Sequence, residues 1–275
     1  MNAAAWLLLA GGGAVLLWLY GWPAWRRRRA LSQPLDPAWP ASLAAQCHWY
    51  RRLPRLDRLR LQRLMVEFLE HVTFVGLGGL EVGEPMRLKV AAEACRMRLG
   101  LGPPVFPAVR FIYLYPGPWR ARIHEESEDG VVHEGEDERS GETWHEGLVF
   151  LAWDEIAAAG ETGGAAGAYH LVAHEFAHVL DHEWGLTAGI DERGELENGV
   201  SGTGVRACLA AEYRALCAAE QAGWALWLDD YATADPAEFF AVASEAYFDR
   251  RSALATARPA LHDCLRKIYR DGKIG

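Results

Sequence analysis

The pattern of apolar and polar positions predicts a mainly helical chain. Apolar residues at helical spacing, interleaved with Arg and Glu, predict an amphipathic helix over Arg55–His71 and a second helix over Pro85–Leu99. The same spacing predicts further helices over Val205–Gly223, Pro236–Arg250 and Arg258–Arg270. Gly-rich and polar stretches separate these segments and predict loops.

Two runs rich in β-branched and aromatic residues predict strands at Val109–Tyr115 and Gly147–Trp153. Ten acidic residues lie between Glu125 and Glu146 among several glycines, and we expect a solvated hairpin or loop there. The second strand has two open interpretations. As an edge strand it would accept an extended peptide by main-chain pairing, and as an interior strand it would belong to the core.

The N-terminal segment has the pattern of a membrane anchor. Residues Ala3–Trp25 carry no charge and are followed directly by Arg26–Arg29. A segment of this length can span a bilayer as a helix, and arginines that follow the span place the body of the chain in the cytoplasm. We therefore expect a single-pass protein of the bacterial inner membrane. Residues 1–30 form the anchor, 31–54 a juxtamembrane linker and 55–275 the main domain.

Composition narrows the class of protein. The chain has 275 residues, 51% of them hydrophobic, which is ample for a sizeable core. The net charge of −9 hides nine arginines against two aspartates through residue 60, so the remainder is strongly acidic. An acidic body argues against nucleic acid as a partner. The five cysteines are odd in number and form no C-x-x-C pair, which favours buried thiols in a reducing compartment.

The most informative stretch is YHLVAHEFAHVLDH, residues 169–182, which contains a His-Glu-x-x-His pattern. His174 and His178 fall one helical turn apart on the same face, so both imidazoles can bind one ion. Glu175 lies about a hundred degrees round the helix, near enough to reach a metal-bound water. The apolar residues between them predict a buried helix that ends near Gly185. This pattern is typical of zinc peptidases.

A peptidase zinc site needs a third protein ligand and leaves the fourth position to water. Glu238 is the preferred candidate, because Asp235 can cap a helix that begins at Pro236, although Glu238 could instead close a capping box. Glu245 lies on the same face two turns later and is the reserve ligand. Glu197 is a further alternative, at a distance reminiscent of thermolysin-like enzymes but in a setting that does not look helical.

Other polar residues flank the pattern. His170 and His182 continue a ladder of histidines four residues apart, but the ladder spreads over about 18 Å, too far for one ion. We interpret both as flanking residues. Asp181 could orient a ligand imidazole or could be an exposed acid at the helix end. The metzincin pattern is excluded, because it requires Gly and His where this chain has Asp181 and Trp184.

Three stretches resemble the Mlc titration factor A family of zinc-dependent peptidases: HEFAHVLD, YATADPAEFFAVASEAYF and RPALHDCLRKIYRD. The segments GLGGLEV and SGETWHEGLVFLAWDEI are also similar, so the resemblance covers most of residues 55–271. It implies an α+β, mainly helical, zincin-like metallopeptidase domain with a small sheet. In that family, and in the similar catalytic domain of anthrax lethal factor, the third zinc ligand is a Glu preceded seven residues earlier by a Tyr that faces the active site. The resemblance therefore implies Glu238 as ligand and Tyr231 as active-site residue.

The predicted function is a membrane-anchored, aminopeptidase-like zinc peptidase that acts on a peptide or protein substrate. Zn²⁺ on His174, His178 and Glu238 would lower the pKa of its water from 15.7 towards roughly 7. Glu175 would accept the proton, and the Tyr231 hydroxyl would donate to the oxyanion. The enterobacterial family member binds the glucose repressor Mlc. The alternative is therefore a tethered regulatory binding protein that sequesters a transcriptional regulator of sugar uptake, with zinc structural or vestigial.

Overall fold

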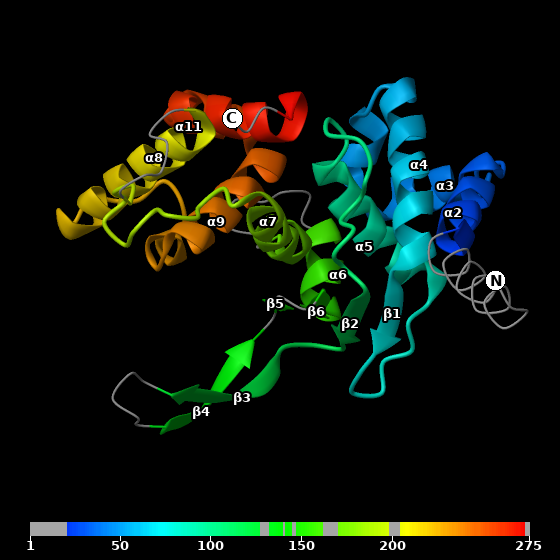
Figure 1. Ribbon diagram of the computed structural model, residues 1–275, viewed down its shortest axis with the longest axis horizontal. Helices are drawn as coiled ribbons and strands as arrows, with labels where there is room; N and C mark the ends of the chain where they lie inside the picture. Colours follow the sequence, from blue (N-terminus) through cyan, green and yellow to red (C-terminus); the bar gives the residue numbers. More distant parts are fainter. Residues whose placement is uncertain are drawn as a thin grey trace, which may run out of the picture.

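The computed structural model describes residues 21–126, 132–139, 141–144, 147–161, 170–197 and 204–272. Within them the chain is mainly helical, with a four-stranded sheet and a separate two-stranded hairpin. Figure 1 shows helix α7 near the centre, with α4 and α5 on one side of it and α8, α9 and α11 on the other. The prediction of a mainly helical chain with a small sheet is confirmed.

The main sheet has the strand order β1-β2-β6-β5. Its strands are β1 (Thr73–Gly76), β2 (Phe111–Tyr115), β6 (Leu148–Ala152) and β5 (Gly141–Trp144). The first three pair in parallel, and β5 pairs antiparallel with β6. Strands β2 and β6 lie within the two predicted strands. Because β6 is interior, the core interpretation of that segment holds, and β5 forms the edge.

The core side of the sheet follows the two-residue period of its strands. Ile112 and Leu114 on β2 are fully buried, as are Val149 and Leu151 on β6. The alternate residues point to the other face of the sheet. There the rings of Tyr113 on β2 and Phe150 on β6 stack with their centroids 4.8 Å apart. Helix α7 lies against β5 and β6, so the sheet supports the helix that carries the His-Glu-x-x-His pattern.

Three helices form the centre of the molecule: α4 (Arg55–His71), α5 (Glu84–Met97) and α7 (Leu171–Trp184). Helix α5 contacts both α4 and α7. The rings of Phe68 on α4, Phe176 on α7 and Phe106 in a loop meet edge to face with centroids 4.7–6.3 Å apart, and all three are fully buried. Burial of three aromatic rings fixes α7 within the core.

The C-terminal third packs against the other side of α7. It consists of α8 (Gly204–Gln221), η3 (Asp230–Thr233), α9 (Pro236–Asp249), α10 (Arg251–Ala257), α11 (Pro259–Arg266) and the π-helix η4 (Lys267–Asp271). Helix α9 makes extensive contact with α7 and with η3. The predicted helices of this region correspond to α8, α9 and the pair α11–η4. Its arrangement brings the carboxylates of α9 next to the histidines of α7.

The segment expected to be a linker contains helices. They are α3 (Trp39–Gln46) and the 3₁₀ helix η2 (His48–Arg52), while α2 (Trp22–Ser32) precedes the segment and ends at its start. Leu43, Trp49 and Tyr50 are buried and belong to the main core. Within the predicted linker, residues 39–46 and 48–52 are thus helical, whereas residues 33–38 form neither helix nor strand. These helices are too short to display a helical period, so the prolines and polar residues dominated the prediction.

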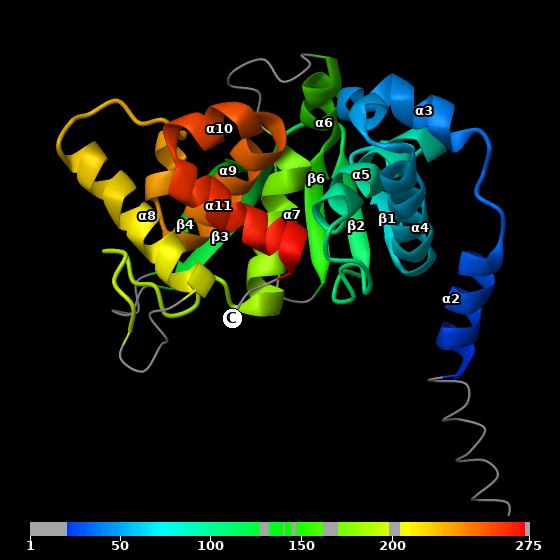
Figure 2. The same cartoon turned by 90° about the horizontal axis from the view of Figure 1, so that it is seen from above.

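The predicted membrane span, Ala3–Trp25, lies mostly outside the described residues, which begin at residue 21. No helix in the described part of the chain is long and apolar enough to cross a bilayer. Helix α2 continues through the arginine run and packs against α4, where Arg26 pairs with Glu70 at 2.6 Å. Figure 2 shows α2 at the periphery of the molecule.

The acidic stretch contains an antiparallel hairpin, as the sequence allowed. Strand β3 (Trp119–Glu126) pairs with β4 (Val132–Arg139), and the hairpin projects from the body (Figure 1). It stands between β2 and β5 along the chain and forms a separate sheet. Helix α6 (Trp153–Glu161), which was not expected, follows β6 directly.

Candidate metal centre

Helix α7 presents the His-Glu-x-x-His pattern from a well-defined position. His170 caps its start, where Nδ1 accepts a hydrogen bond from the Ala173 N–H at 3.2 Å. The helix ends at Gly185, whose φ of 58° is the left-handed conformation that glycine adopts most easily, as the sequence predicted. Of the ten residues from Leu171 to Leu180, all except His178 are buried. The histidines therefore stand on a helix that is fixed by the core.

Three donor atoms converge beside α7. The Nε2 atoms of His174 and His178 lie 3.2 Å apart. Oε2 of Glu238, on α9, lies 3.0 Å from Nε2 of His174 and 3.5 Å from Nε2 of His178. Within the described ranges, these residues form a group of ligand-type side chains whose donor atoms all lie within 4.8 Å of one another. The structure thus brings together the three side chains that the sequence predicted.

The spacing of these atoms fits a tetrahedral cation site. Zinc binds imidazole nitrogen at about 2.0–2.1 Å and carboxylate oxygen at about 2.0–2.2 Å, so tetrahedral ligand atoms lie about 3.3 Å apart. The observed separations of 3.0, 3.2 and 3.5 Å bracket this value. In addition, Oε2 of Glu238 is buried without a hydrogen-bond donor. A buried acceptor is costly to leave unsatisfied, and a cation would satisfy it.

Glu238 reaches this position because of how α9 begins. The Asp235 side chain caps the helix by accepting hydrogen bonds from the N–H groups of Ala237 at 2.7 Å and Glu238 at 2.9 Å. Pro236 occupies the first turn, where its missing N–H costs nothing. In a capping box the Glu238 carboxylate would turn back to the cap residue, whereas here it faces the imidazoles.

The chain matches a known protein family over most of its length. The sequence profile described as glucose-regulated metallo-peptidase M90 matches residues 22–270. The chain belongs to the M90 metallopeptidase family. The uncharacterized protein slr2042 of Synechocystis is 31% identical over 259 residues, which cover 93% of this chain and 92% of that protein.

Other relatives of this M90 chain are named Mlc titration factor A. The protein from Serratia proteamaculans is 28% identical over 265 residues, covering 90% of this chain and 92% of the relative. The protein from Pectobacterium atrosepticum is 27% identical over 252 residues, covering 90% and 91%. The family resemblance seen in the sequence is confirmed.

The electrostatics of the cluster formed by His174, His178 and Glu238 favour a positive charge between the three donor atoms. Burial alone would raise the pKa of Glu238, but the neighbouring imidazoles of His174 and His178 outweigh it and hold that pKa well below its usual range. Burial would lower the pKa of His174, yet the carboxylates of Glu238 and Glu245 raise it to about 10. The carboxylates thus stabilise either a proton or a cation on this face of α7.

Two further predicted site residues lie near His174 and Glu238. Glu175 is only 3% exposed, and its charge contributes to raising the pKa of both His174 and Tyr231. Tyr231 lies in η3 and is 53% exposed, with its ring centroid 6.3 Å from that of His174. Burial and the negative charge of Glu238 raise the pKa of Tyr231 to about 12, so its hydroxyl keeps its proton even in mildly alkaline solution.

The reserve ligand Glu245 takes a different position. Its Oε1 lies 2.8 Å from Nδ1 of His174, on the opposite edge of the ring from the converging Nε2 atoms. Sequence reasoning placed Glu245 on the correct face of α9, since it stands two turns after Glu238, but missed that contact. The contact between α7 and α9 is tertiary, and no local pattern specifies it.

The remaining candidates lie away from the three donor atoms. His170 is the cap of α7, and His182 is exposed near its end. Glu197 is exposed, and its N–H donates to the Gly189 carbonyl at 2.9 Å. Asp181 fits neither of its two interpretations, because its carboxylate accepts hydrogen bonds from the N–H and hydroxyl of Thr187 and so fastens the loop after α7.

Proposed function

We propose that this chain is a zinc-dependent peptidase with a zincin-like catalytic domain. The observation that carries the proposal is the convergence of His174 Nε2, His178 Nε2 and Glu238 Oε2 at tetrahedral spacing, with Glu175 on the same helix. Two imidazoles and one carboxylate are the donor set of zinc peptidases, which keep a fourth position open. The side chain of His178 is 20% exposed and that of His174 is 4% exposed, so the centre is reached from the side of His178.

The reaction follows from the positions of the side chains. Zinc held by His174, His178 and Glu238 supplies Lewis-acid chemistry, which acidifies water and polarises a carbonyl group. Glu175 takes the proton of the attacking water and transfers it to the leaving amine. Because Glu175 is buried, this proton transfer takes place in a medium of low dielectric constant, which strengthens the electrostatic interactions involved.

Tyr231 supplies a hydrogen bond to the developing oxyanion. A tyrosine hydroxyl is protonated at neutral pH and can donate a hydrogen bond, and the Tyr231 ring lies beside that of His174. The half-exposed ring stands at the solvent side of the centre, where a substrate enters. A preorganised donor at this position stabilises the transition state more than the ground state.

Replacement of Tyr231 by Phe is expected to lower kcat by about 10²–10³-fold with zinc content unchanged, since one oxyanion donor is removed and no ligand. Steady-state peptide hydrolysis and metal analysis on the same preparation measure both quantities. Tyr113→Phe, on β2 of the sheet, is the matched control and is expected to keep wild-type kcat. Loss of zinc in Tyr231→Phe would show that the tyrosine supports the metal ligands instead.

The proposed substrate is an extended peptide cleaved in an aminopeptidase-like reaction. Strand β5 forms an edge of the main sheet and lies against α7, which supports main-chain pairing with a peptide beside the centre. The aminopeptidase character rests on the family resemblance.

We further propose that the peptidase is anchored in the inner membrane with its domain in the cytoplasm. This rests on the uncharged residues 3–25 and the arginines that follow them. Helix α2 exposes about half of Trp22 and of Trp25, whose rings stack at 5.0 Å, and Trp is enriched at membrane–water interfaces.

A second candidate function is the sequestration of a transcriptional regulator. It is supported by the name Mlc titration factor A of several relatives. The buried Glu175 favours hydrolysis, because a site that only stabilises the fold has no use for a base next to an open coordination position. Binding and hydrolysis are separable by experiment.

Metal removal tests the proposed function directly. Dialysis of the purified protein against a strong chelator is expected to abolish peptide hydrolysis, and one equivalent of Zn²⁺ per chain is expected to restore it, whereas Mg²⁺ is not. Hydrolysis of a peptide library is followed by mass spectrometry before and after each step. Activity that survives in metal-free protein, or a protein that binds no zinc under replete conditions, would overturn the proposal.

A further inference from the structure

Glu245 forms a bridge between a metal-ligand ring and the start of α7. Its Oε1 lies 2.8 Å from Nδ1 of His174, and its Oε2 accepts a hydrogen bond from the His170 N–H at 2.9 Å. The Glu245 side chain is 12% exposed, so both contacts lie in a largely desolvated region. One carboxylate on α9 thus holds a side chain and a backbone group of α7 at the same time.

The chemistry of this bridge determines which nitrogen of His174 is available. An ionised carboxylate only accepts hydrogen bonds, so Nδ1 carries the proton that faces Glu245. The other nitrogen, Nε2, then has its lone pair free for a cation, and it is the atom that faces Glu238 and His178. Glu245 therefore selects the binding-competent tautomer and fixes the plane of the ring.

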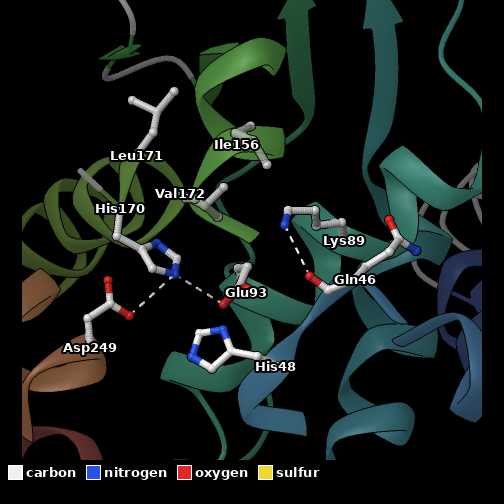
Figure 3. Close-up of a pocket in the computed structure, with 10 residues that line it drawn as sticks. Gln46, His48, Lys89, Glu93, Ile156, His170, Leu171, Val172 and Asp249 are labelled. Carbon is white, nitrogen blue, oxygen red and sulfur yellow. Dashed lines mark hydrogen bonds and ion pairs between the residues drawn. The ribbon is translucent and has the colours of Figure 1, made fainter. Parts of the chain in front are cut away.

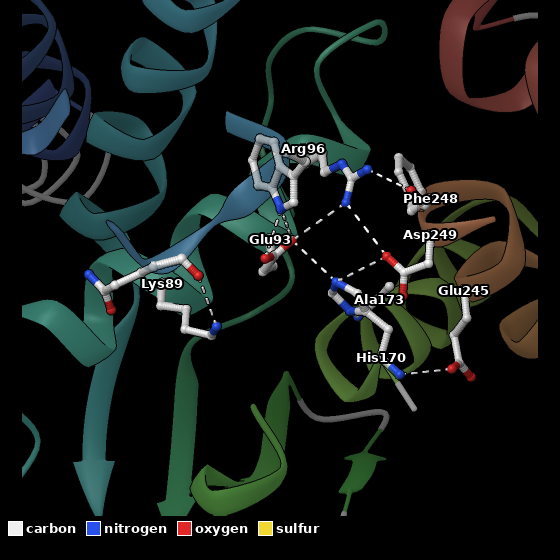
Figure 4. A network of polar contacts seen from close by, with 10 residues as sticks. Lys89, Glu93, Arg96, His170, Ala173, Glu245, Phe248 and Asp249 are labelled. Carbon is white, nitrogen blue, oxygen red and sulfur yellow. Dashed lines mark hydrogen bonds and ion pairs between the residues drawn. The ribbon is translucent and has the colours of Figure 1, made fainter. Parts of the chain in front are cut away.

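A buried ionic cluster also holds the first turn of α7, where His170 lies, and it includes residues of α5. Nε2 of His170 lies 3.3 Å from Glu93 and 3.9 Å from Asp249 (Figure 4). Glu93 also accepts the Trp49 N–H at 2.9 Å, and Arg96 lies 3.8–3.9 Å from both carboxylates. The cluster connects α5, α7 and α9 at the point where α7 begins.

The ring of His170 is positioned by these polar contacts. Its Nδ1 accepts the Ala173 N–H, so the proton on Nε2 faces Glu93. Figure 3 shows the ring at the wall of a small pocket, with His48 and Lys89 among the other lining residues. Since open space adjoins the ring, close packing alone does not hold it, and the carboxylates do.

We infer that Glu245 is a positioning residue of this centre, which orients His174 for metal binding while its second oxygen holds the His170 backbone in place. The inference rests on the proposed function, because it concerns the same three ligands. It assigns to Glu245 a role distinct from that of Glu238, seven residues earlier on the same helix. Carboxylates that support a ligand imidazole typically contribute 10–100-fold to metal affinity.

The test is Glu245→Gln, which keeps the size of the side chain but replaces one acceptor oxygen by a donor group. Zinc affinity, measured by competition with a chromogenic chelator, is expected to fall about 10–100-fold. In proton NMR of the zinc-loaded wild type, the Nδ1 proton of His174 is expected as a downfield signal protected from solvent exchange, and in Glu245→Gln this protection is lost. Glu212→Gln is the matched control, since it weakens the part-buried pair between Glu212 on α8 and Arg258, the residue before α11, and is expected to leave zinc affinity unchanged.

The outcomes separate this inference from the proposed function. If the wild type binds zinc but Glu245→Gln binds it equally well, the positioning role is wrong and the peptidase proposal stands. If the wild-type protein binds no zinc, the proposed function itself fails. Should the variant not fold, the wild-type NMR signal still decides, because a zinc-loaded His174 without a protected Nδ1 proton contradicts the inference. Equal losses in Glu212→Gln and Glu245→Gln would also contradict it.

Discussion

Replacing Glu175 by Gln is expected to lower kcat for peptide hydrolysis by about 10²–10⁴-fold, the usual contribution of a general base. Gln keeps the shape of the side chain but cannot accept the proton of the attacking water. Zinc content is expected to stay at the wild-type level, because Glu175 lies outside the three converging donor atoms. Steady-state kinetics together with metal analysis measure the two quantities.

The control for this experiment is Glu192→Gln, which changes an exposed carboxylate in the loop after α7 and is expected to keep wild-type kcat. Equal kcat in Glu175→Gln and the wild type would remove the proposed base from the mechanism. A zinc-loaded but inactive Glu175→Gln would also provide a trap for bound peptide, since the ligands are intact. It would separate regulator binding from hydrolysis in the same protein.

Replacing Glu238 by Gln is expected to weaken zinc binding by more than the 10–100-fold typical of residues that only support a ligand. Glu238 contributes the one anionic donor, and its Oε2 is 3.0 Å from Nε2 of His174. Two neutral imidazoles alone leave the cation without a compensating charge. Hydrolysis at limiting zinc is expected to disappear together with the metal, and calorimetric titration with Zn²⁺ measures the affinity.

Glu197→Gln is the matched control, because this exposed carboxylate was the other downstream candidate and lies outside the centre. It is expected to bind zinc as the wild type does. The opposite pattern, with zinc lost in Glu197→Gln and retained in Glu238→Gln, would move the third ligand to the loop. Loss of zinc in Glu245→Gln alone would make Glu245 the ligand.

The sequence predicted the elements that have a clear period. Helix α4 has the predicted bounds, and α7 ends at Gly185, as the sequence predicted. Strand β1, with four residues, and helix α3, with eight, are too short to show a period above their Pro-rich and Gly-rich surroundings. Their burial depends on contacts with segments distant in the chain.

In the candidate site, too, some residues follow from local sequence patterns and others depend on tertiary contacts. His174 and His178 follow from helical spacing alone, and the cap at Asp235 supported Glu238. The support of His174 by Glu245 depends on how α9 crosses α7, and the role of Asp181 depends on the fold of the following loop. Both are tertiary contacts between side chains whose local patterns allow several partners.

Helix α9 carries two different carboxylates of one centre, the donor Glu238 and, two turns later, the brace Glu245. A chain that ended before residue 236 would keep the whole His-Glu-x-x-His pattern but would lose both of these carboxylates. A rotation or slide of this one helix would likewise disturb ligation and ring orientation together. The His-Glu-x-x-His pattern alone is therefore not enough to indicate a working metal site. In a related chain, the two carboxylates of α9 are to be checked together with the two histidines of α7.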